Sequence, residues 1–161
     1  MEDEATQFLH SLETRYGGPV GFRTYSTWYA CSDGTVRDYG VFLFVIGSTF
    51  HFEDFERKPS LFGFPLKPRK NEPSYVKYER SFLASEVVSV ALVQKQVALD
   101  CALGYVKPDQ IAPAGSIARL FKPLVSRVVL QDGTTFFFEL IDQKKFLLAL
   151  KEGQDGSVQS V

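Results

Sequence analysis

The clearest structural signal in the sequence is Val128–Leu140, VVLQDGTTFFFEL, which is followed by Asp142–Leu150, DQKKFLLAL. In the first segment an Asp-Gly pair separates two apolar, strand-like runs, and this arrangement predicts a β-hairpin. The second segment begins with an Asp, which is a favoured helix N-cap, and then places apolar side chains at helical spacing. The sequence therefore predicts paired strands over 124–141 and a helix over 142–152.

The C-terminal helix has an apolar face formed by Phe146, Ala149 and Leu150. Gly153 follows this face, and a glycine in that place predicts the end of the helix because it adopts the left-handed C-cap conformation without strain. The remaining segment, 153–161, is polar, and we expect it to be disordered.

Upstream of the hairpin, aromatic and β-branched runs separated by tight-turn residues predict most of a sheet. An Asp-Gly pair predicts a hairpin between strands over 22–31 and 36–46. A Gly-Ser pair then predicts the turn into a third strand over 49–55. A single helix over 86–103 is disfavoured, because apolar residues would surround it and many of them are β-branched. We expect further strands over 75–83, 86–93 and 97–103.

Two stretches between the strands lack a regular pattern. Four prolines interrupt 56–73, so we expect a long loop there. A second irregular stretch, 104–123, also carries prolines, and we expect it to hold a short helical turn around 117–121.

An amphipathic helix is predicted near the N-terminus, over 3–16. A Gly-Gly-Pro run ends it. An apolar stripe usually faces the protein's own core, so we expect this helix to pack on the barrel, and docking on another chain is the alternative. The stripe is formed by Ala5, Phe8, Leu9, Leu12 and Tyr16.

Together these elements predict a mainly β (α+β) protein. We expect a single antiparallel barrel or strongly bent sheet of about seven strands, with one helix before it and one after it. A chain of 161 residues suits one domain, so we expect a single domain over 1–161 with its barrel over 22–141. The C-terminal helix is expected to cap an open end of the barrel, where it would cover exposed strand edges.

The hairpin and helix over 128–150 resemble the closing elements of the pleckstrin-homology-like superfold, including its bacterial and GRAM-type members. The shared pattern is a hydrophobic strand, Asp-Gly, an aromatic strand, an Asp, and a helix that contains Phe and Leu. The resemblance implies a binding domain rather than an enzyme, with phosphoinositides, peptides or other proteins as ligands. Lipid-binding members carry basic residues on the first two strands and their loop, whereas the loop here, 32–35, has no Lys or Arg.

The bulk composition is that of an ordinary globular protein, with 45% hydrophobic residues, 23% charged residues and a net charge of −1. This charge gives no overall attraction to nucleic acid, which we do not expect as a partner. Cys31 and Cys101 form no CxxC pair, and the acidic start, Met1–Glu4, differs from a signal peptide. We therefore expect a cytoplasmic, reduced protein.

Motifs for catalysis and for metal binding are missing from the sequence. There is no nucleophile elbow and no phosphate-cradling loop, so we expect no enzymatic activity and no cofactor. His51 and Glu53 share one face of a strand, but a metal site needs three or four ligands and the chain has two His. We interpret them as a polar strand face rather than a metal site.

The segment 57–80 has the most distinctive local chemistry. It carries seven Lys or Arg against two Glu, a local net charge of +5, and an apolar run, 61–66, lies between its basic clusters. Aromatic and Arg side chains supply much of the binding energy at protein interfaces. The same composition suits an anionic membrane surface. The candidate binding residues are Arg57, Lys58, Phe62, Phe64, Lys67, Arg69 and Lys70.

The sequence favours a non-enzymatic protein-interaction or scaffold domain. It would act through this basic segment and through an exposed strand edge or a groove beside the terminal helix. Five alternatives stay open. The domain could attach peripherally to anionic membrane lipid, hold a small apolar ligand inside the barrel, form a homo-oligomer, or be an enzyme without a recognisable motif. The basic segment could also be merely solvated, with its Phe side chains folded onto the barrel.

Overall fold

The structure is a computed structural model, and it describes residues 3–54, 60–61, 64–65, 70–71 and 77–158. In chain order the elements are α1 (Glu4–Tyr16), β1 (Val20–Cys31), β2 (Val36–Ile46), β3 (Thr49–Asp54), β4 (Ser60–Leu61), β5 (Phe64–Pro65), β6 (Glu79–Leu83), η1 (Ala84–Glu86), β7 (Val87–Gln94), α2 (Lys95–Ala102), η2 (Pro108–Gln110), α3 (Ser116–Phe121), β8 (Leu124–Leu130), β9 (Thr135–Leu140) and α4 (Gln143–Val158).

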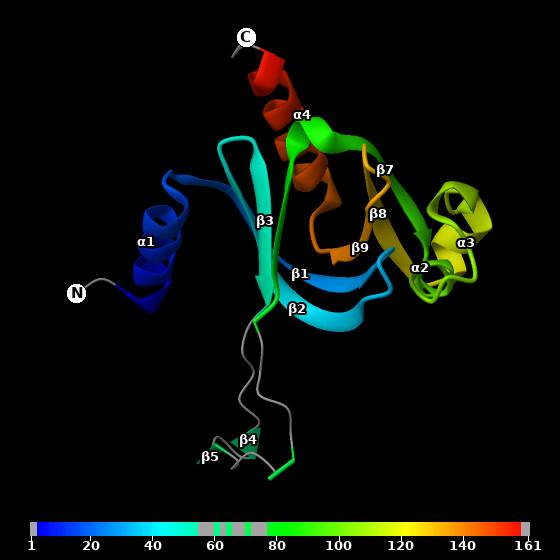
Figure 1. Cartoon of the computed structure of the whole chain (residues 1–161), viewed down its shortest axis with the longest axis horizontal. Coiled ribbons are helices and arrows are strands. Elements are labelled where there is room, and N and C mark those ends of the chain that lie inside the picture. Colours follow the sequence, from blue (N-terminus) through cyan, green and yellow to red (C-terminus); the bar gives the residue numbers. More distant parts are fainter. Residues whose placement is uncertain (1–2, 55–59, 62–63, 66–69, 72–76, 159–161) are drawn as a thin grey trace.

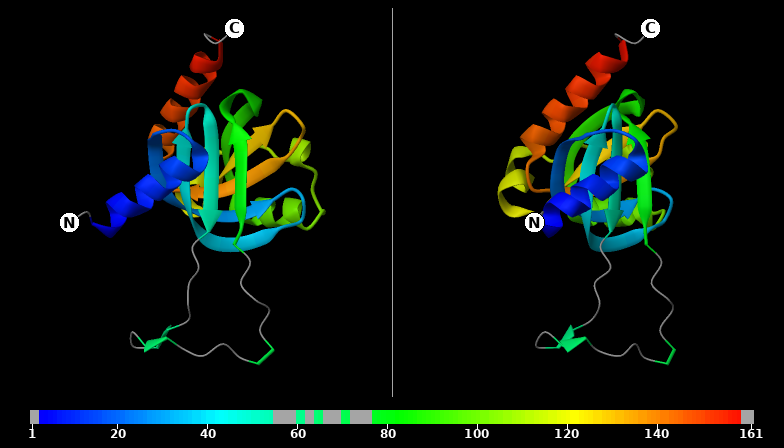
Figure 2. Two further views of the ribbon diagram at one scale, coloured as in Figure 1. Left: turned by 60° about the vertical axis from the view of Figure 1, so that its left-hand side comes forward. Right: turned by 90° about the vertical axis from the view of Figure 1, so that its left-hand side faces the viewer.

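Seven of these strands form one antiparallel sheet in the order β6-β3-β2-β1-β9-β8-β7, and β4 pairs with β5 separately. The sheet curls into a half-barrel, with α4 lying across its open side (Figures 1 and 2). β1 is the central strand, because it pairs with β2 on one side and with β9 on the other. The predicted fold class, a strongly bent sheet of about seven strands with a helix before and after it, is confirmed.

Both predicted Asp-Gly hairpins are present. Gly34 and Gly133 have φ angles of 96° and 90°, in the left-handed region that glycine adopts without strain. In each turn the Asp side chain accepts a hydrogen bond from the backbone N–H two residues on, at 2.9 Å in the first hairpin and 2.8 Å in the second. These bonds favour the turns locally, before any strand pairing is counted.

The helix starts were also predicted correctly. Asp3 caps α1 by accepting a hydrogen bond from the backbone N–H of Thr6 at 2.7 Å. Asp142 precedes α4 and accepts one from the backbone N–H of Lys145 at 3.1 Å. Gly17 ends α1 in the left-handed conformation, with φ of 76°. Each contact satisfies a backbone group that the helix itself leaves without a partner.

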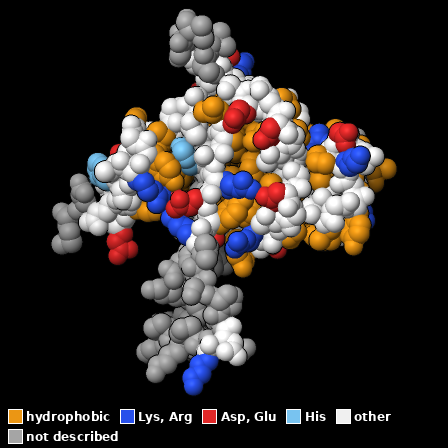
Figure 3. Space-filling model, viewed as in Figure 1, with side chains coloured by type: hydrophobic (Ala, Val, Ile, Leu, Met, Phe, Trp, Pro, Cys, Tyr) orange, Lys and Arg blue, Asp and Glu red, His pale blue; other side chains and the backbone are white. Residues whose placement is uncertain are grey.

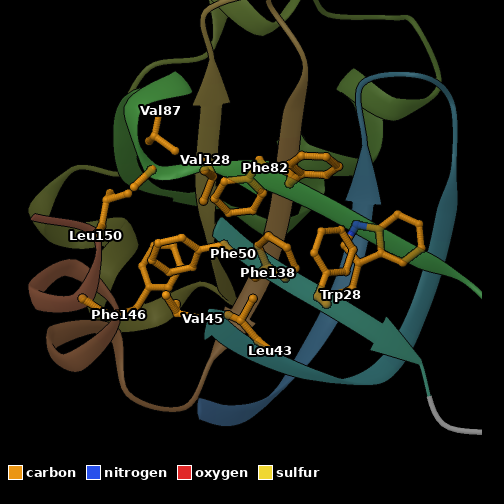
Figure 4. Close-up of a cluster of buried hydrophobic side chains, with 14 of the residues drawn as sticks. Trp28, Leu43, Val45, Phe50, Phe82, Val87, Val128, Phe138, Phe146 and Leu150 are labelled. Carbon is orange, nitrogen blue, oxygen red and sulfur yellow. The ribbon is translucent and has the colours of Figure 1, made fainter. Parts of the chain in front are cut away.

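The concave face of the sheet holds the main core, which is dominated by aromatic rings. The ring of Phe52 lies 5.3 Å from that of Phe136 and 5.0 Å from that of Phe138. Figure 4 shows Phe146 of α4 among these side chains, and its ring lies 5.3 Å from that of Phe50. The interior is therefore filled by side chains from the sheet and from α4 together.

The convex face carries two further clusters, each under a helix. Leu12 of α1 packs with Phe42 and Phe44 of β2. On the other half of the sheet, α2 packs against Phe137 of β9 and its neighbours through buried residues such as Ala98. β2 and β9 are consequently buried on both faces, and the expected packing of the N-terminal helix on the barrel is confirmed.

The predicted strand over 97–103 is wrong, because this segment is the helix α2. Alternating apolar residues suggested a strand, but Ala98, Cys101 and Ala102 recur at helical spacing and are the residues that α2 buries. They are small, so the helix can lie close to the sheet. The convex face of β1 and β9 needs an apolar cover, and this long-range requirement selected the helix over the strand.

The predicted helix end at Gly153 is also wrong, since α4 runs on to Val158 and includes part of the tail expected to be disordered. Gly153 is buried inside the helix, where α4 crosses η1. A Cβ placed on it would stand 2.7 Å from Cβ of Ala84. Glycine is therefore present for close approach of two backbones, not for a left-handed turn.

This contact predicts opposite effects for two substitutions in one helix. Gly153→Ala is expected to lower the free energy of unfolding by about 1–3 kcal/mol, because the added methyl overlaps Ala84. Gly156→Ala is the matched control, since its Cβ would meet no atom within 4 Å. It should raise stability by about 0.5–1 kcal/mol through helix propensity. Urea unfolding measures both, and equal effects would contradict the close approach.

Candidate functional site

Most of the basic segment singled out from the sequence lies outside the described residues. This holds for Arg57, Lys58, Phe62, Lys67 and Arg69. Of the other two candidates, Phe64 belongs to the backbone pairing of β4 with β5, and Lys70 is an exposed turn residue. Binding of a partner or of anionic lipid through this segment stays a prediction.

The structure has a groove beside the terminal helix, as the sequence suggested in general terms. It lies between the edge strand β7 and α4 and has a volume of about 280 Å³. β7 is the last strand in the sheet order, so its outer edge has no strand partner in the part of the chain that the structure describes. The lining residues are Val87, Val88, Ser89, Val90, Leu147, Leu150, Lys151 and Gln154.

Contacts with the core, with η1 and with β7 hold α4, the helix wall of the groove, in place. Phe146 and Leu150 of α4 are buried in the main core. One turn further on, the side-chain amide of Gln154 donates to the backbone carbonyls of Ala84 and Val87, at 3.2 Å in each case. These contacts fasten α4 to η1 and to the start of β7, so one end of the groove is closed.

The other end of the β7 edge is covered by the connection between α2 and α3. Here the backbone N–H of Ala114 donates to the carbonyl of Leu92 at 2.8 Å. Residues two apart in a strand aim their backbone groups at the same edge, so the N–H and C=O of Val90 point the same way as those of Leu92. The register of β7 is irregular between Val87 and Ser89, so this alternation reaches no further back than Val90. The open part of the edge is therefore short and centres on Val90, directly beside the groove.

The side chains around this open edge are mainly apolar and accessible. Val88 is 58% exposed and Leu147 is 41% exposed, and they belong to opposite walls of the groove. Lys151 adds one cation to the helix wall. An edge of free backbone groups next to an apolar trough can accept an extended peptide as an additional strand.

A second hollow, of about 410 Å³, lies on the opposite flank of α4. It is bounded by the start of β1, by the turn between β2 and β3 at Gly47, and by Ala149, Glu152, Gly153 and Gly156 of α4. Glycines form much of its wall, and it presents few side chains with binding chemistry. We therefore take the groove on the β7 side as the candidate site.

A buried carboxylate joins α1 to the sheet on the other side of the molecule. Glu53 of β3 is 3% exposed and forms ion pairs with Arg15 of α1 and, at 3.0 Å, with Lys77. The phenol of Tyr16 also donates to it at 3.3 Å. Burial, followed by the nearby Glu53 carboxylate, raises the pKa of Tyr16, which keeps this phenol protonated as a donor.

His51 belongs to the same polar strand face and contacts aromatic rings. Its imidazole centroid lies 4.3 Å from that of Tyr16 and 5.3 Å from that of Phe44. Burial lowers the pKa of His51, and the Glu53 carboxylate opposes this effect. The groups that the sequence suggested as possible metal ligands thus contact α1 instead, and no cluster of three potential metal ligands occurs among the residues described.

The lowered pKa of His51 predicts a pH dependence of stability. A base whose pKa is depressed on folding binds fewer protons when folded, so its stabilising contribution is complete above the unfolded pKa, near 6.5, and falls as the pH drops below it. We expect the wild type to lose more stability than His51→Phe as the pH falls below about 6.5. Urea unfolding at several pH values tests this, and parallel curves for the two proteins would contradict it.

The two cysteines show no sign of a reactive role. Cys31 and Cys101 are both buried and both free. Burial raises the pKa of each thiol, so the nucleophilic thiolate form is disfavoured.

No helix in the described part of the chain has the length and apolar character needed to cross a bilayer.

Comparison of the chain with protein-family models, with curated proteins and with solved structures gives no match. The assignment of the candidate site therefore depends on its geometry alone. The sequence indicated an edge or groove beside the last helix but did not assign residues to it. One local signal was available: Leu147 is an apolar residue that falls outside the predicted apolar face of the terminal helix.

Proposed function

We propose that this protein is a non-enzymatic interaction domain of pleckstrin-homology-like type. It binds an extended segment of a partner protein as an added strand on β7, beside α4. The observation that carries the proposal is the short open stretch of the β7 edge, which lies between two covered ends and faces a groove of about 280 Å³.

Strand addition explains why the edge and the groove occur together. Main-chain hydrogen bonds to the edge supply affinity, while alternate side chains of the added strand enter the neighbouring trough and supply selectivity. The strand order and the helix across the open side of the half-barrel are in line with the resemblance of 128–150 to the closing elements of that superfold. The concave interior is filled by aromatic side chains, so a small ligand inside the barrel is not proposed.

The proposal is tested with a library of random peptides displayed on phage and the purified protein as bait. We expect the selected peptides to shift or protect the backbone amides of 88–90 in NMR spectra. Val88→Asp combined with Leu147→Asp should weaken their binding about tenfold or more, because a carboxylate without a partner is costly to bury.

Tyr105→Ser is the matched control, because Tyr105 is 79% exposed and does not line the groove. This variant should bind the selected peptides as the wild type does. Peptides that bind the double aspartate variant equally well, or that leave the amides of 88–90 unchanged, would overturn the proposal.

A further inference from the structure

The helix α3 differs from the longer helices in the direction of its apolar face. α1 buries Leu12, and α2 and α4 bury several apolar residues each. α3, in contrast, buries none, although Ile117, Leu120 and Phe121 share one face at positions i, i+3 and i+4. These three side chains are 78%, 77% and 78% exposed. An apolar face this exposed marks a contact site rather than a part of the core.

Basic residues outnumber acidic ones in the segment that carries this face. Arg119 and Lys122 flank the three apolar residues, and Lys107 lies in the connection that leads to α3. All three basic residues are exposed, and none forms an ion pair with another described residue. Asp109 is the one acidic residue among 103–123. The segment therefore carries a net positive charge next to its apolar face.

The shape of the region favours a lipid bilayer over a folded protein as the partner. α3 lies at the outer margin of the molecule, on the side opposite α1 (Figure 1). Hydrophobic side chains gather at this margin, with basic and acidic side chains beside them (Figure 3). A stable protein interface needs roughly 800 Å² of complementary surface from each partner. A protruding six-residue helix offers little of that, whereas the interface of a bilayer accepts protruding side chains without a matching shape.

We propose that α3 is a membrane-contact site that inserts Ile117, Leu120 and Phe121 into the interface of an anionic bilayer. Arg119 and Lys122 remain at the level of the headgroups, where a negative surface attracts them. This site is distinct from the β7 groove and from the basic segment 57–80. It does not depend on the peptide-binding proposal, and it would place the domain at a membrane surface.

The test is co-sedimentation of the full chain with vesicles of phosphatidylcholine, with and without phosphatidylserine. We expect binding that requires phosphatidylserine. The triple variant Ile117→Ser, Leu120→Ser, Phe121→Ser should bind at least about tenfold more weakly, because burial of even one such side chain is worth about a factor of ten in affinity. The triple variant should still fold, because the replaced side chains lie outside all three core clusters. Circular dichroism checks that its secondary structure is unchanged.

Ile141→Ser is the control, because it removes an apolar side chain that is 77% exposed elsewhere on the molecule. It should bind vesicles as the wild type does. The proposal is overturned if the wild type does not sediment with anionic vesicles, or if the triple variant sediments equally well. It is also overturned if light scattering shows a wild-type dimer that the triple variant abolishes while no vesicle binding occurs, since α3 would then contact a second copy of the chain.

Discussion

Phe146→Ala is expected to lower the free energy of unfolding by about 3–5 kcal/mol. Phe146 is fully buried, and its ring contacts those of Phe50 and Phe22, with centroids 5.3 and 6.4 Å away. Removal of the ring loses its burial and leaves a cavity between α4 and the sheet, which rigid aromatic neighbours cannot fill. Urea unfolding followed by circular dichroism measures the loss.

The matched control for this substitution is Leu148→Ala, two residues on in the same helix. Leu148 is 58% exposed, so we expect a change within about 0.5 kcal/mol. Because Phe146 also holds one wall of the β7 groove, Phe146→Ala should weaken the binding of groove-selected peptides as well. A Phe146→Ala protein as stable as Leu148→Ala would show that α4 is not anchored in the core.

The second large effect concerns the buried Glu53. Replacement of both cations, Arg15→Met with Lys77→Met, is expected to cost about 3–5 kcal/mol, because the carboxylate would be left buried with the Tyr16 phenol as its remaining described donor. The cations themselves are 43% and 39% exposed, so they are the members of the cluster that water can solvate. The cost therefore arises from the anion.

That origin gives a direct check. Addition of Glu53→Met to the double variant should recover most of the lost stability, since the buried charge is then gone. Lys145→Met is the control for loss of an ion pair at the surface, where Lys145 lies 3.5 Å from Asp142, and it should leave the stability nearly unchanged. A triple variant that is less stable than the double one would contradict this account.

The parts of the fold that sequence analysis predicted well are those with local causes. Both Asp-Gly hairpins, the caps at Asp3 and Asp142, and the strand over 36–46 follow from the conformations that neighbouring residues allow. The two errors have distant causes. α2 forms where the convex face needs a cover, and Gly153 lies where η1 approaches α4.

The candidate site could be predicted only in outline for the same reason. That β7 lies at an edge follows from the pairing of β1 with β9, which no local pattern near 87–94 encodes. The sequence predicted a helical turn over 117–121, which is part of α3. It did not predict that the apolar face of this helix is exposed, because that depends on how the whole connection from α2 lies on the sheet. Sequence periodicity shows which residues share a helix face, but it does not show whether that face is buried or exposed to solvent.

The central position of β1 also determines when the sheet can be completed. β1 pairs with its neighbour β2 early in the chain, but its second partner is β9, with Ser26 opposite Leu140. During synthesis this side of β1 has to wait until β9 has left the ribosome, and contacts between such distant segments slow folding. Until β9 has been synthesised this edge of β1 has no strand partner, so we expect the sheet to be completed late in folding.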